Sequence, residues 1–256
     1  MITDSFDARS PEIILPDDTI RDEAKAAAAR HMIDTAIIVF SNKLLLALLE
    51  AGRIEPMDEG LRTGSAAFRE PIYRIKGKET IIALAGTGAP IAAAIVEELI
   101  TLFHPKRFLA FGSCGALCDI PAGRLILPVS AVRDEGTSYH YAPAADEIEL
   151  RGAAKLGALL DGLGVGYVKG KTWTTDAFYR ETEKNKDRRL RAGCICVEME
   201  CAALQAVCDF RKVEFYQFLY TADSLDGKWD RRTLGEQERD SRLAYFSVAE
   251  ALAERL

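Results

Sequence analysis

Along most of this chain, continuous runs of apolar residues alternate with segments in which apolar residues recur with the period of an α-helix. The runs that predict strands are Thr35–Phe40, Ile72–Ile75, Glu79–Ala85, Arg107–Phe111, Leu125–Pro128, Ala131–Arg133, Val165–Lys171, Cys194–Val197 and Phe215–Thr221. The runs that predict helices are Arg21–His31, Lys43–Ala51, Ile91–Phe103, Glu147–Leu160, a segment from Glu200 onward, and Leu243–Leu256. A hairpin is expected around Gly77. Elsewhere helices separate the strands, which is typical of βαβ units.

This order of elements predicts an α/β fold. We expect a single three-layer domain over residues 31–256, with a mostly parallel central sheet flanked by helices, because no linker or repeat interrupts it. Residues 1–30 are polar and rich in Asp and Ala, and are expected to form an N-terminal arm and helix. Sheets of this kind bind ligands at the C-terminal ends of their strands. The motifs described below fall at those ends.

Composition narrows the class of protein. The chain of 256 residues has 48% hydrophobic and 28% charged residues, a net charge of −6 and a pI near 5.3, which argues against nucleic-acid or membrane-surface binding. No apolar run approaches the roughly 20 residues of a membrane span, and the N-terminus lacks secretory-signal features. Six cysteines match no common zinc spacing and are expected to be buried free thiols without a metal. A cytoplasmic location is expected.

Two glutamates lie two residues apart in the stretch Val197–Leu204, between an apolar run and an Ala- and Leu-rich helix. The helix dipole explains one acidic side chain at this position. The pair, Glu198 and Glu200, suits a site for neutral sugar hydroxyls, because a carboxylate accepts two hydrogen bonds in a fork. The alternative is a pair of solvated acids in the first helical turn.

Two glycine turns follow predicted strands. In the first, Gly86-Thr87-Gly88, the third glycine of a dinucleotide fingerprint is replaced by Ile91, so a tight turn before a helix explains it equally well. In the second, Gly112-Ser113-Cys114-Gly115, small residues let backbone N–H groups and the Ser113 hydroxyl point into one space, as an anion cradle requires. Phe111 replaces the first glycine of a nucleophile elbow, which argues against a hydrolase serine.

Three further segments carry candidate chemistry. The loop Arg133–Tyr141 gathers aromatic and polar side chains, among them Tyr139 and His140. Phe178 follows a strand end beside several hydroxyls, a position that suits stacking on a flat heterocycle. Asp223 ends an apolar strand; if half-buried it would have a raised pKa and could donate a proton, whereas its alternative role is to cap the next turn.

Taken in order, these segments resemble the nucleoside phosphorylase superfamily, which includes uridine and purine nucleoside phosphorylases and related nucleosidases. The resemblance covers residues 35–256 and is carried by the stretches GTGAPIAAAIVEEL, GSCGAL, RDEGTSYHY, TTDAFY, VEMECAAL and TADS. It implies phosphorolytic cleavage of a nucleoside to free base and ribose 1-phosphate through an oxocarbenium-like transition state. It also implies phosphate as co-substrate, no metal or organic cofactor, and a homo-oligomer, either dimer or hexamer.

The resemblance assigns a role to each motif. Glu200 would bind the ribose 2′- and 3′-hydroxyls, with Met199 packed on the sugar and Glu198 beside them. Phe178 would stack on the base, Asp223 would protonate a purine ring, and Ser113 with Gly112 would bind phosphate. Thr87 and Gly88 are assigned to substrate binding, and Tyr139 and His140 would lie near the sugar.

The chain departs from the family pattern where phosphate is expected to bind. An arginine usually stands at the position of Ala110, and the usual Gly-Asp-Pro motif with its arginine is absent after the first strand. Lys43, Arg133 and Arg180 are candidate replacements. A nucleosidase that uses water, and a non-catalytic nucleoside-binding homologue, therefore remain alternatives. Asp223 favours a purine, whereas the loop containing Tyr139 resembles uridine phosphorylases, so the base stays open.

Overall fold

The computed structural model describes residues 1–57, 61–63 and 70–256. The strands are β1 (Thr35–Val39), β2 (Ile54–Pro56), β3 (Tyr73–Ile75), β4 (Thr80–Leu84), β5 (Arg107–Ala116), β6 (Leu125–Asp134), β7 (Glu147–Glu149), β8 (Tyr167–Thr175), β9 (Cys194–Glu198) and β10 (Glu214–Ser224). The α-helices are α1 (Pro16–Thr19), α2 (Asp22–Ala28), α3 (Asn42–Glu50), α4 (Ala89–Phe103), α5 (Ser138–Tyr141), α6 (Ala153–Gly162), α7 (Glu183–Arg191), α8 (Cys201–Arg211) and α9 (Arg239–Ala253). Two short 3₁₀ helices are η1 (Ile2–Asp4) and η2 (Phe178–Arg180).

The sheet is mixed, and its long ladders are parallel. Strands β4, β1, β5 and β10 run parallel to one another, and so do β6, β8 and β9. The two sets meet in antiparallel pairs, β5 with β9 and β10 with β6. Because β10 also pairs with β5, the strands β5, β9, β8, β6 and β10 form a closed ring. This closure fixes the strands that carry most of the candidate site residues relative to one another.

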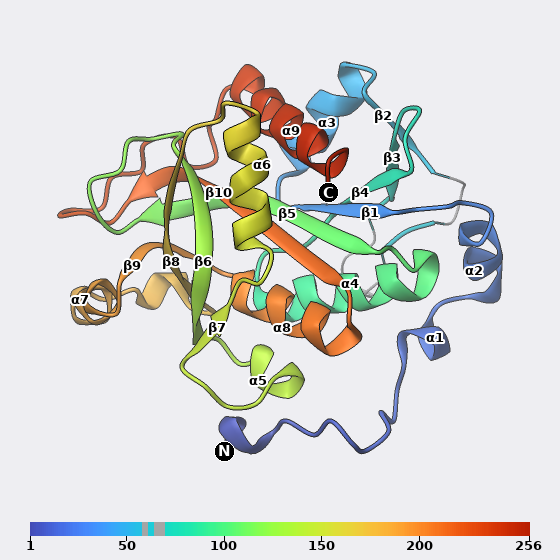
Figure 1. Ribbon diagram of the computed structural model, residues 1–256, viewed down its shortest axis with the longest axis horizontal. Coiled ribbons are helices and arrows are strands. Elements are labelled where there is room, and N and C mark those ends of the chain that lie inside the picture. Colours follow the sequence, from blue (N-terminus) through green and yellow to red (C-terminus); the bar gives the residue numbers. More distant parts are fainter. Residues whose placement is uncertain (58–60, 64–69) are drawn as a thin grey trace.

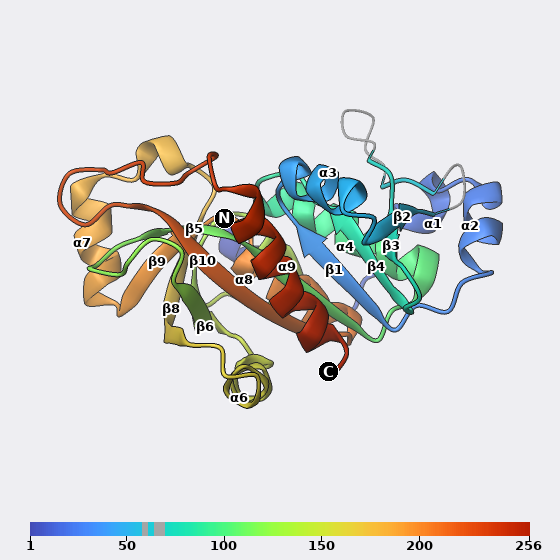
Figure 2. The same cartoon turned by 90° about the horizontal axis from the view of Figure 1, so that it is seen from above.

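Helices cover both faces of the sheet, as the sequence predicts. Figure 1 shows α3 and α9 above the central strands and α4 and α8 below them. Figure 2, seen from above, places α7 and α2 at opposite ends of the molecule. The predicted α/β fold of a single domain with a sheet flanked by helices is confirmed. Within the described ranges, no helix is long and apolar enough to cross a membrane.

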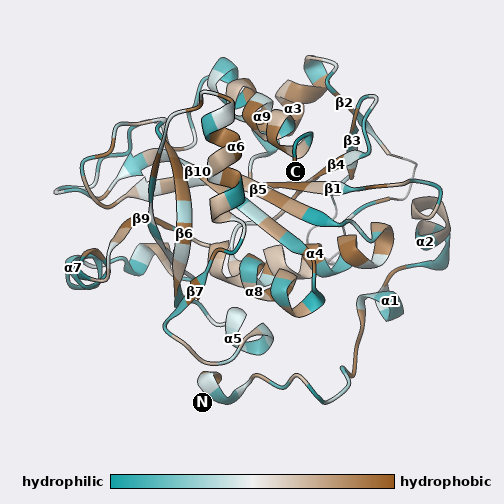
Figure 3. Cartoon of the chain, viewed as in Figure 1, coloured by the Kyte–Doolittle hydropathy of each residue, from teal (hydrophilic) through white to brown (hydrophobic). Residues whose placement is uncertain are grey.

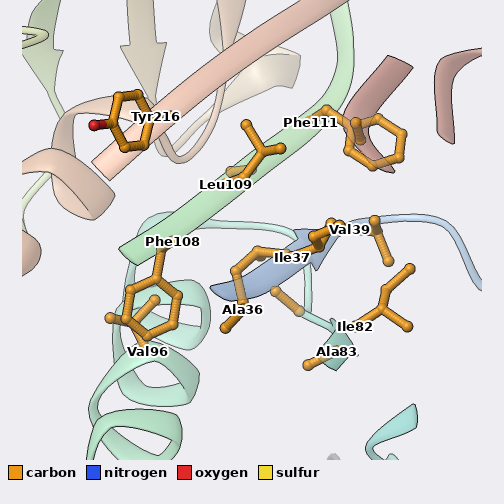
Figure 4. Packing of buried hydrophobic residues seen from close by; sticks show 14 of the residues in the cluster. Ala36, Ile37, Val39, Ile82, Ala83, Val96, Phe108, Leu109, Phe111 and Tyr216 are labelled. Atoms are coloured by element: carbon orange, nitrogen blue, oxygen red, sulfur yellow. The ribbon is translucent and has the colours of Figure 1, made fainter. Parts of the chain in front are cut away.

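The core lies between the central strands and the helices. All five residues of β1 and all five of β4 are buried, which explains why these strands read as continuous apolar runs. Figure 3 shows the hydrophobic residues concentrated on the central strands, while α7 is hydrophilic. In Figure 4, Phe108 of β5 points toward Val96 of α4, and both side chains are fully buried. This packing holds β5 rigidly at the centre of the sheet.

The N-terminal segment lies against the lower helices. The Phe6 ring meets the Phe210 ring edge-on at 6.5 Å, and Glu12 pairs with Arg211 at 2.9 Å. Arg211 also donates to both carboxylate oxygens of Glu97 in α4. The segment borders a groove of about 410 Å³ that α4, α5 and α8 also line.

Several sequence-based expectations are wrong, among them the turn expected at residues 112–115, which lies inside β5. The helix predicted over Glu147–Leu160 begins only at Ala153, because residues 147–149 form β7 and pair with Ser130–Val132. The two extended pieces predicted around Pro128 form one strand, β6, with a register shift at that proline. Helix α7 was missed because it is charged on nearly all sides; Thr182, whose Oγ1 accepts from Asn185 N, was the available N-cap signal.

Candidate active site

Glu200 joins two loops that are far apart in the sequence. It stands at the N-cap position of α8, and its Oε1 accepts a hydrogen bond of 2.6 Å from the backbone N–H of Gly88. Gly88, with φ of 108°, is itself the N-cap of α4, and its backbone favours glycine. Burial, and after it the nearby Glu198 carboxylate, raises the pKa of Glu200 to about 8 although the Gly88 bond lowers it. The Glu200 carboxyl is therefore largely protonated near neutral pH.

Glu198 has a different environment from Glu200. Its Oε2 accepts from the backbone N–H groups of Glu200 (2.8 Å) and Cys201 (2.7 Å). Its Oε1 accepts from the hydroxyls of Thr174 (2.6 Å) and Thr172 (3.3 Å). A carboxylate has about four acceptor positions, and the protein itself fills these. The expected contact between Glu198 and substrate is therefore replaced by a capping role at the start of α8.

The glycine-rich end of β5 exposes one side chain. Ser113 is exposed although its neighbours Gly112 and Cys114 are buried, so its hydroxyl faces solvent from the central strand. A Cβ at Gly112 would lie 2.8 Å from Cδ2 of Phe40, which explains the glycine there. Ala110 is fully buried in the hydrophobic core, and strand alternation places it on the face opposite Ser113. Ala110 therefore contributes nothing to an anion site.

Asp223 is the penultimate residue of β10, at the end of the strand as the sequence predicts. It pairs with Gly115 of β5 after a bulge, and its Oδ2 accepts a hydrogen bond of 2.9 Å from Nε1 of Trp229. Burial raises the pKa of Asp223, while the Trp229 bond lowers it. Burial and the Asp223 charge together raise the pKa of Glu181 to about 7. Two carboxyl groups with raised pKa values thus share this end of the site.

The remaining strand-end residues are accessible to a ligand. Phe178 in η2 is 48% exposed, and its ring lies 3.9 Å from that of Tyr179. Thr87 is exposed beside Gly88, and Met199 is half-buried beside Glu200. These side chains come from the β4–α4, β8–α7 and β9–α8 connections. An exposed aromatic ring at a strand end is available for stacking on a flat base.

Tyr139 and His140 lie in a loop that holds its own shape. The hydroxyl of Tyr139 contacts the carbonyl oxygens of Arg133 (3.2 Å) and Ala145 (3.3 Å), and the Arg133 guanidinium lies 4.1 Å above its ring. His140 is exposed and lines the groove beside the N-terminal segment. No contact within the described residues joins His140 to Glu200, so within one chain these two residues face different surroundings.

The three candidate replacements for the family arginines differ in availability. Arg133 is buried and donates to the Ser138 hydroxyl and to two backbone carbonyls. Nζ of Lys43 donates to the carbonyl oxygen of Gly235 at 2.7 Å. Arg180 is exposed in η2, close in sequence to Phe178. Arg133 is thus engaged by the protein, whereas Lys43 and Arg180 both have exposed side chains.

Several residues important to the geometry were missed from the sequence. Oδ2 of Asp176 accepts from Gly136 N at 3.0 Å, and its charge raises the pKa of Glu200. Trp229 donates a hydrogen bond to Asp223, and the Asp223 charge raises the pKa of Glu181. Nothing in the local pattern distinguishes these side chains from ordinary loop residues. Among residues 1–57, 61–63 and 70–256, no group of three His, Cys, Asp or Glu side chains could hold a metal ion.

Parts of this chain are similar in sequence to curated phosphorylases. Purine nucleoside phosphorylase DeoD-type of Geobacillus kaustophilus (strain HTA426) is 34% identical over 136 residues, covering 50% of this chain and 56% of that protein. Guanosine phosphorylase of Halorubrum lacusprofundi is 31% identical over 138 residues, covering 51% of this chain and 55% of that protein. The chain thus spans about half the length of these curated relatives.

Solved structures share the fold. The AMP nucleosidase of Bacteroides thetaiotaomicron superposes with a TM-score of 0.68 at 21% identity, covering 94% of this chain and 97% of that one. Purine nucleoside phosphorylase of Toxoplasma gondii superposes with a TM-score of 0.70 at 16% identity, covering 89% and 93%. The model of the phosphorylase superfamily matches residues 34–254, which include every strand of the sheet and every strand-end motif described above. On this match, the chain belongs to the phosphorylase superfamily.

Proposed function

We propose that this protein cleaves the N-glycosidic bond of purine nucleosides, with phosphate as the acceptor. The observation that carries the proposal is the buried Glu200 carboxyl, held by Gly88 N at 2.6 Å with its second oxygen not engaged by that bond. A buried acceptor of this kind suits a pair of ribose hydroxyls. The curated relatives named above include purine nucleoside and guanosine phosphorylases, which supports a purine substrate.

The reaction needs a cationic sugar to be stabilised and a leaving base to be neutralised. As the C1′–N bond breaks, its electron pair moves to the base, and the protonated Asp223 supplies a proton to a ring nitrogen. An oxygen of the acceptor forms the new bond to C1′. Glu200, once deprotonated by binding, places negative charge beside the developing oxocarbenium ion. Phe178 stacks on the base and holds it near Asp223.

Because the pKa of Glu200 is raised, substrate binding is expected to be coupled to the release of a proton. In the free protein the carboxyl is largely protonated at pH 7, because its pKa is about 8. Two donating ribose hydroxyls favour the charged form and lower that pKa. Binding therefore releases a proton, and the carboxylate forms only when the sugar is in place.

Water is the second candidate acceptor. The position where the family carries an arginine is occupied by the buried Ala110, and Arg133 is engaged within the protein. A dianionic phosphate is normally held by guanidinium groups. On this observation the exposed side chains of Arg180 and Lys43 and the Ser113 hydroxyl are the candidates to hold an anion in the described part of the chain.

The test is release of free base from a panel of purine and pyrimidine nucleosides, with and without phosphate. Purine release that requires phosphate and yields ribose 1-phosphate supports the proposal. Purine release that ignores phosphate and yields free ribose assigns hydrolysis instead. Preferential release of uracil overturns the purine assignment, and release of no base from any nucleoside indicates a binding protein without this chemistry.

A further inference from the structure

A tryptophan in the segment after β10 is hydrogen-bonded to Asp223. Trp229 donates from Nε1 to Oδ2 of Asp223 at 2.9 Å. The segment is closed at its base, because Ser224 and Asp230 exchange two backbone hydrogen bonds of 2.9 Å each. Gly227, with φ of 73°, makes the turn between them. We call residues 225–230 the Trp229 loop.

Core packing does not explain the position of this indole. Trp229 is 56% exposed, whereas Trp173, the other tryptophan of the chain, is 1% exposed. An exposed tryptophan is held in place mainly by the polar contact it makes, and an indole has one N–H to donate. The hydrogen bond to Asp223 is therefore the main specific interaction of this ring.

The two oxygens of Asp223 differ in their surroundings. Oδ2 is occupied by Trp229, whereas Oδ1 lies 3.4 Å from where a Cβ at Gly115 would stand. Strand alternation puts Gly115 on the same face of β5 as the exposed Ser113. Oδ1 therefore lies on the same face of β5 as the exposed Ser113, beside Leu225 and Val197.

We propose that Trp229 is a positioning residue that occupies Oδ2 of Asp223, so that Oδ1 is the atom that carries the proton to the leaving base. This inference rests on the proposed function. In the step, the proton passes from Oδ1 to a ring nitrogen, the C1′–N electron pair goes to the base, and the acceptor oxygen bonds to C1′. A donor on Oδ2 favours the form in which Oδ2 is the carbonyl oxygen and the proton is on Oδ1, so the loop selects between two protonated forms.

Other groups near Asp223 set the direction of the pH effect. Glu181 approaches from the segment after η2, Cys114 lies on β5, and Arg232 follows the Trp229 loop. The Trp229 N–H stabilises the carboxylate and so lowers the pKa of Asp223. Its removal raises that pKa, provided that the site stays closed. Opening the loop to water instead lowers the pKa, because burial is the main cause of its rise. The two effects have opposite signs.

The experiment compares wild type, Trp229→Phe, Asp223→Asn and the double variant. Each is assayed on inosine, whose base must be protonated, and on 4-nitrophenyl β-D-riboside, whose leaving group departs as an anion. Both assays use the phosphate condition in which wild type is active, across pH 5–9. Lys228→Ala, an exposed neighbour in the Trp229 loop, is the matched control.

We expect Trp229→Phe to lower kcat on inosine by about tenfold, a fraction of the 10²–10⁴ that a general acid supplies, and to leave the nitrophenyl riboside rate within about twofold. The alkaline limb of the inosine profile moves to higher pH. Trp229→Phe has no further effect once Asp223 is Asn. Lys228→Ala behaves as wild type on both substrates.

Equal losses on both substrates, an alkaline limb that moves to lower pH, or an unchanged inosine rate each overturn the role given to Trp229. These results leave the proposed function intact, because wild type remains active. A wild type that releases neither hypoxanthine nor nitrophenol overturns the proposed function itself, and this inference with it.

Discussion

The backbone N–H of Gly88 and Oε1 of Glu200 are 2.6 Å apart, although 112 positions separate the two residues in the chain. The bond joins the first turn of α4 to the first turn of α8, so that one carboxyl is shared between two helix N-termini. Helix N-termini favour negative charge, yet burial holds the pKa of this carboxyl at about 8. Desolvation thus outweighs the helix dipoles in the absence of substrate.

Glu200→Ala should abolish nucleoside turnover while the protein remains folded. The variant loses the acceptor for the ribose hydroxyls and the negative charge beside the oxocarbenium ion, interactions that together contribute on the order of 10²–10³ in rate. The measurement is kcat/KM for inosine, with the far- and near-UV circular dichroism spectra as the check on folding. Turnover at the wild-type rate would remove Glu200 from the site.

Substrate binding should tighten as the pH rises from 6 to 8. The carboxylate form of Glu200 accepts both hydroxyls, and below its pKa of about 8 that form is the minor one. We expect KM for a purine nucleoside to fall by up to about tenfold per pH unit across this range. Glu200→Gln should bind weakly with no such slope. A flat KM in wild type contradicts the assignment of the ribose hydroxyls to this carboxyl.

Glu200 should also make the protein less stable as the pH rises. Its pKa is raised from the ordinary value of 4.5 to about 8, so the folded state holds the proton more tightly than the unfolded state. The stability is full below about pH 4.5 and is lost as pH rises through 8, by up to about 1.4 kcal/mol per pH unit. Urea unfolding at pH 5 and pH 8.5 should therefore show Glu200→Gln gaining stability relative to wild type only at the higher pH.

Thr174→Val should destabilise the protein more than Thr172→Val. The Thr174 hydroxyl donates to Glu198 at 2.6 Å and accepts from Ala202 N at 3.1 Å, so its loss leaves buried polar groups unpaired. The cost is about 1–3 kcal/mol. Thr172 is the matched control, because it makes a single, longer bond of 3.3 Å to the same carboxylate. Equal urea midpoints for the two variants would contradict the capping role of Glu198.

Gly112→Ala should cost about 1–3 kcal/mol of stability through overpacking. The new methyl group would lie 2.8 Å from the Phe40 ring at the end of β1. Gly162→Ala is the control: it adds the same methyl group to α6, where no neighbouring atom lies within 4 Å, and should be neutral or slightly stabilising. The measurement is the melting temperature of both variants. Equal melting temperatures would contradict overpacking of the Gly112→Ala methyl group against Phe40.

Local patterns were sufficient to predict most strands and the family, but not which residue of the site does what. The apolar runs of β1 and β4 and the glycine turn after β4 lie where the sequence indicates, whereas the turn expected at residues 112–115 is part of β5. Glu198 and Glu200 look alike in sequence, and only the packing of Thr174 against β9 shows that the first caps a helix. The hydrogen bond from Trp229 to Asp223 and the effect of the Asp223 charge on the pKa of Glu181 join separate segments, so no local signal reveals them.

The closed ring of strands determines when the sheet can be completed during synthesis of the chain. Strand β10 closes the ring by pairing with β5, and residues 107 positions apart, Arg107 and Glu214, begin that ladder. Such long-range pairings form slowly, and chains fold from the N-terminus during synthesis. On the ribosome, the edge of β5 that pairs with β10 therefore stays unpaired until residues from Glu214 onward have emerged. Asp223, near the end of β10, is thus among the last residues to join the candidate site.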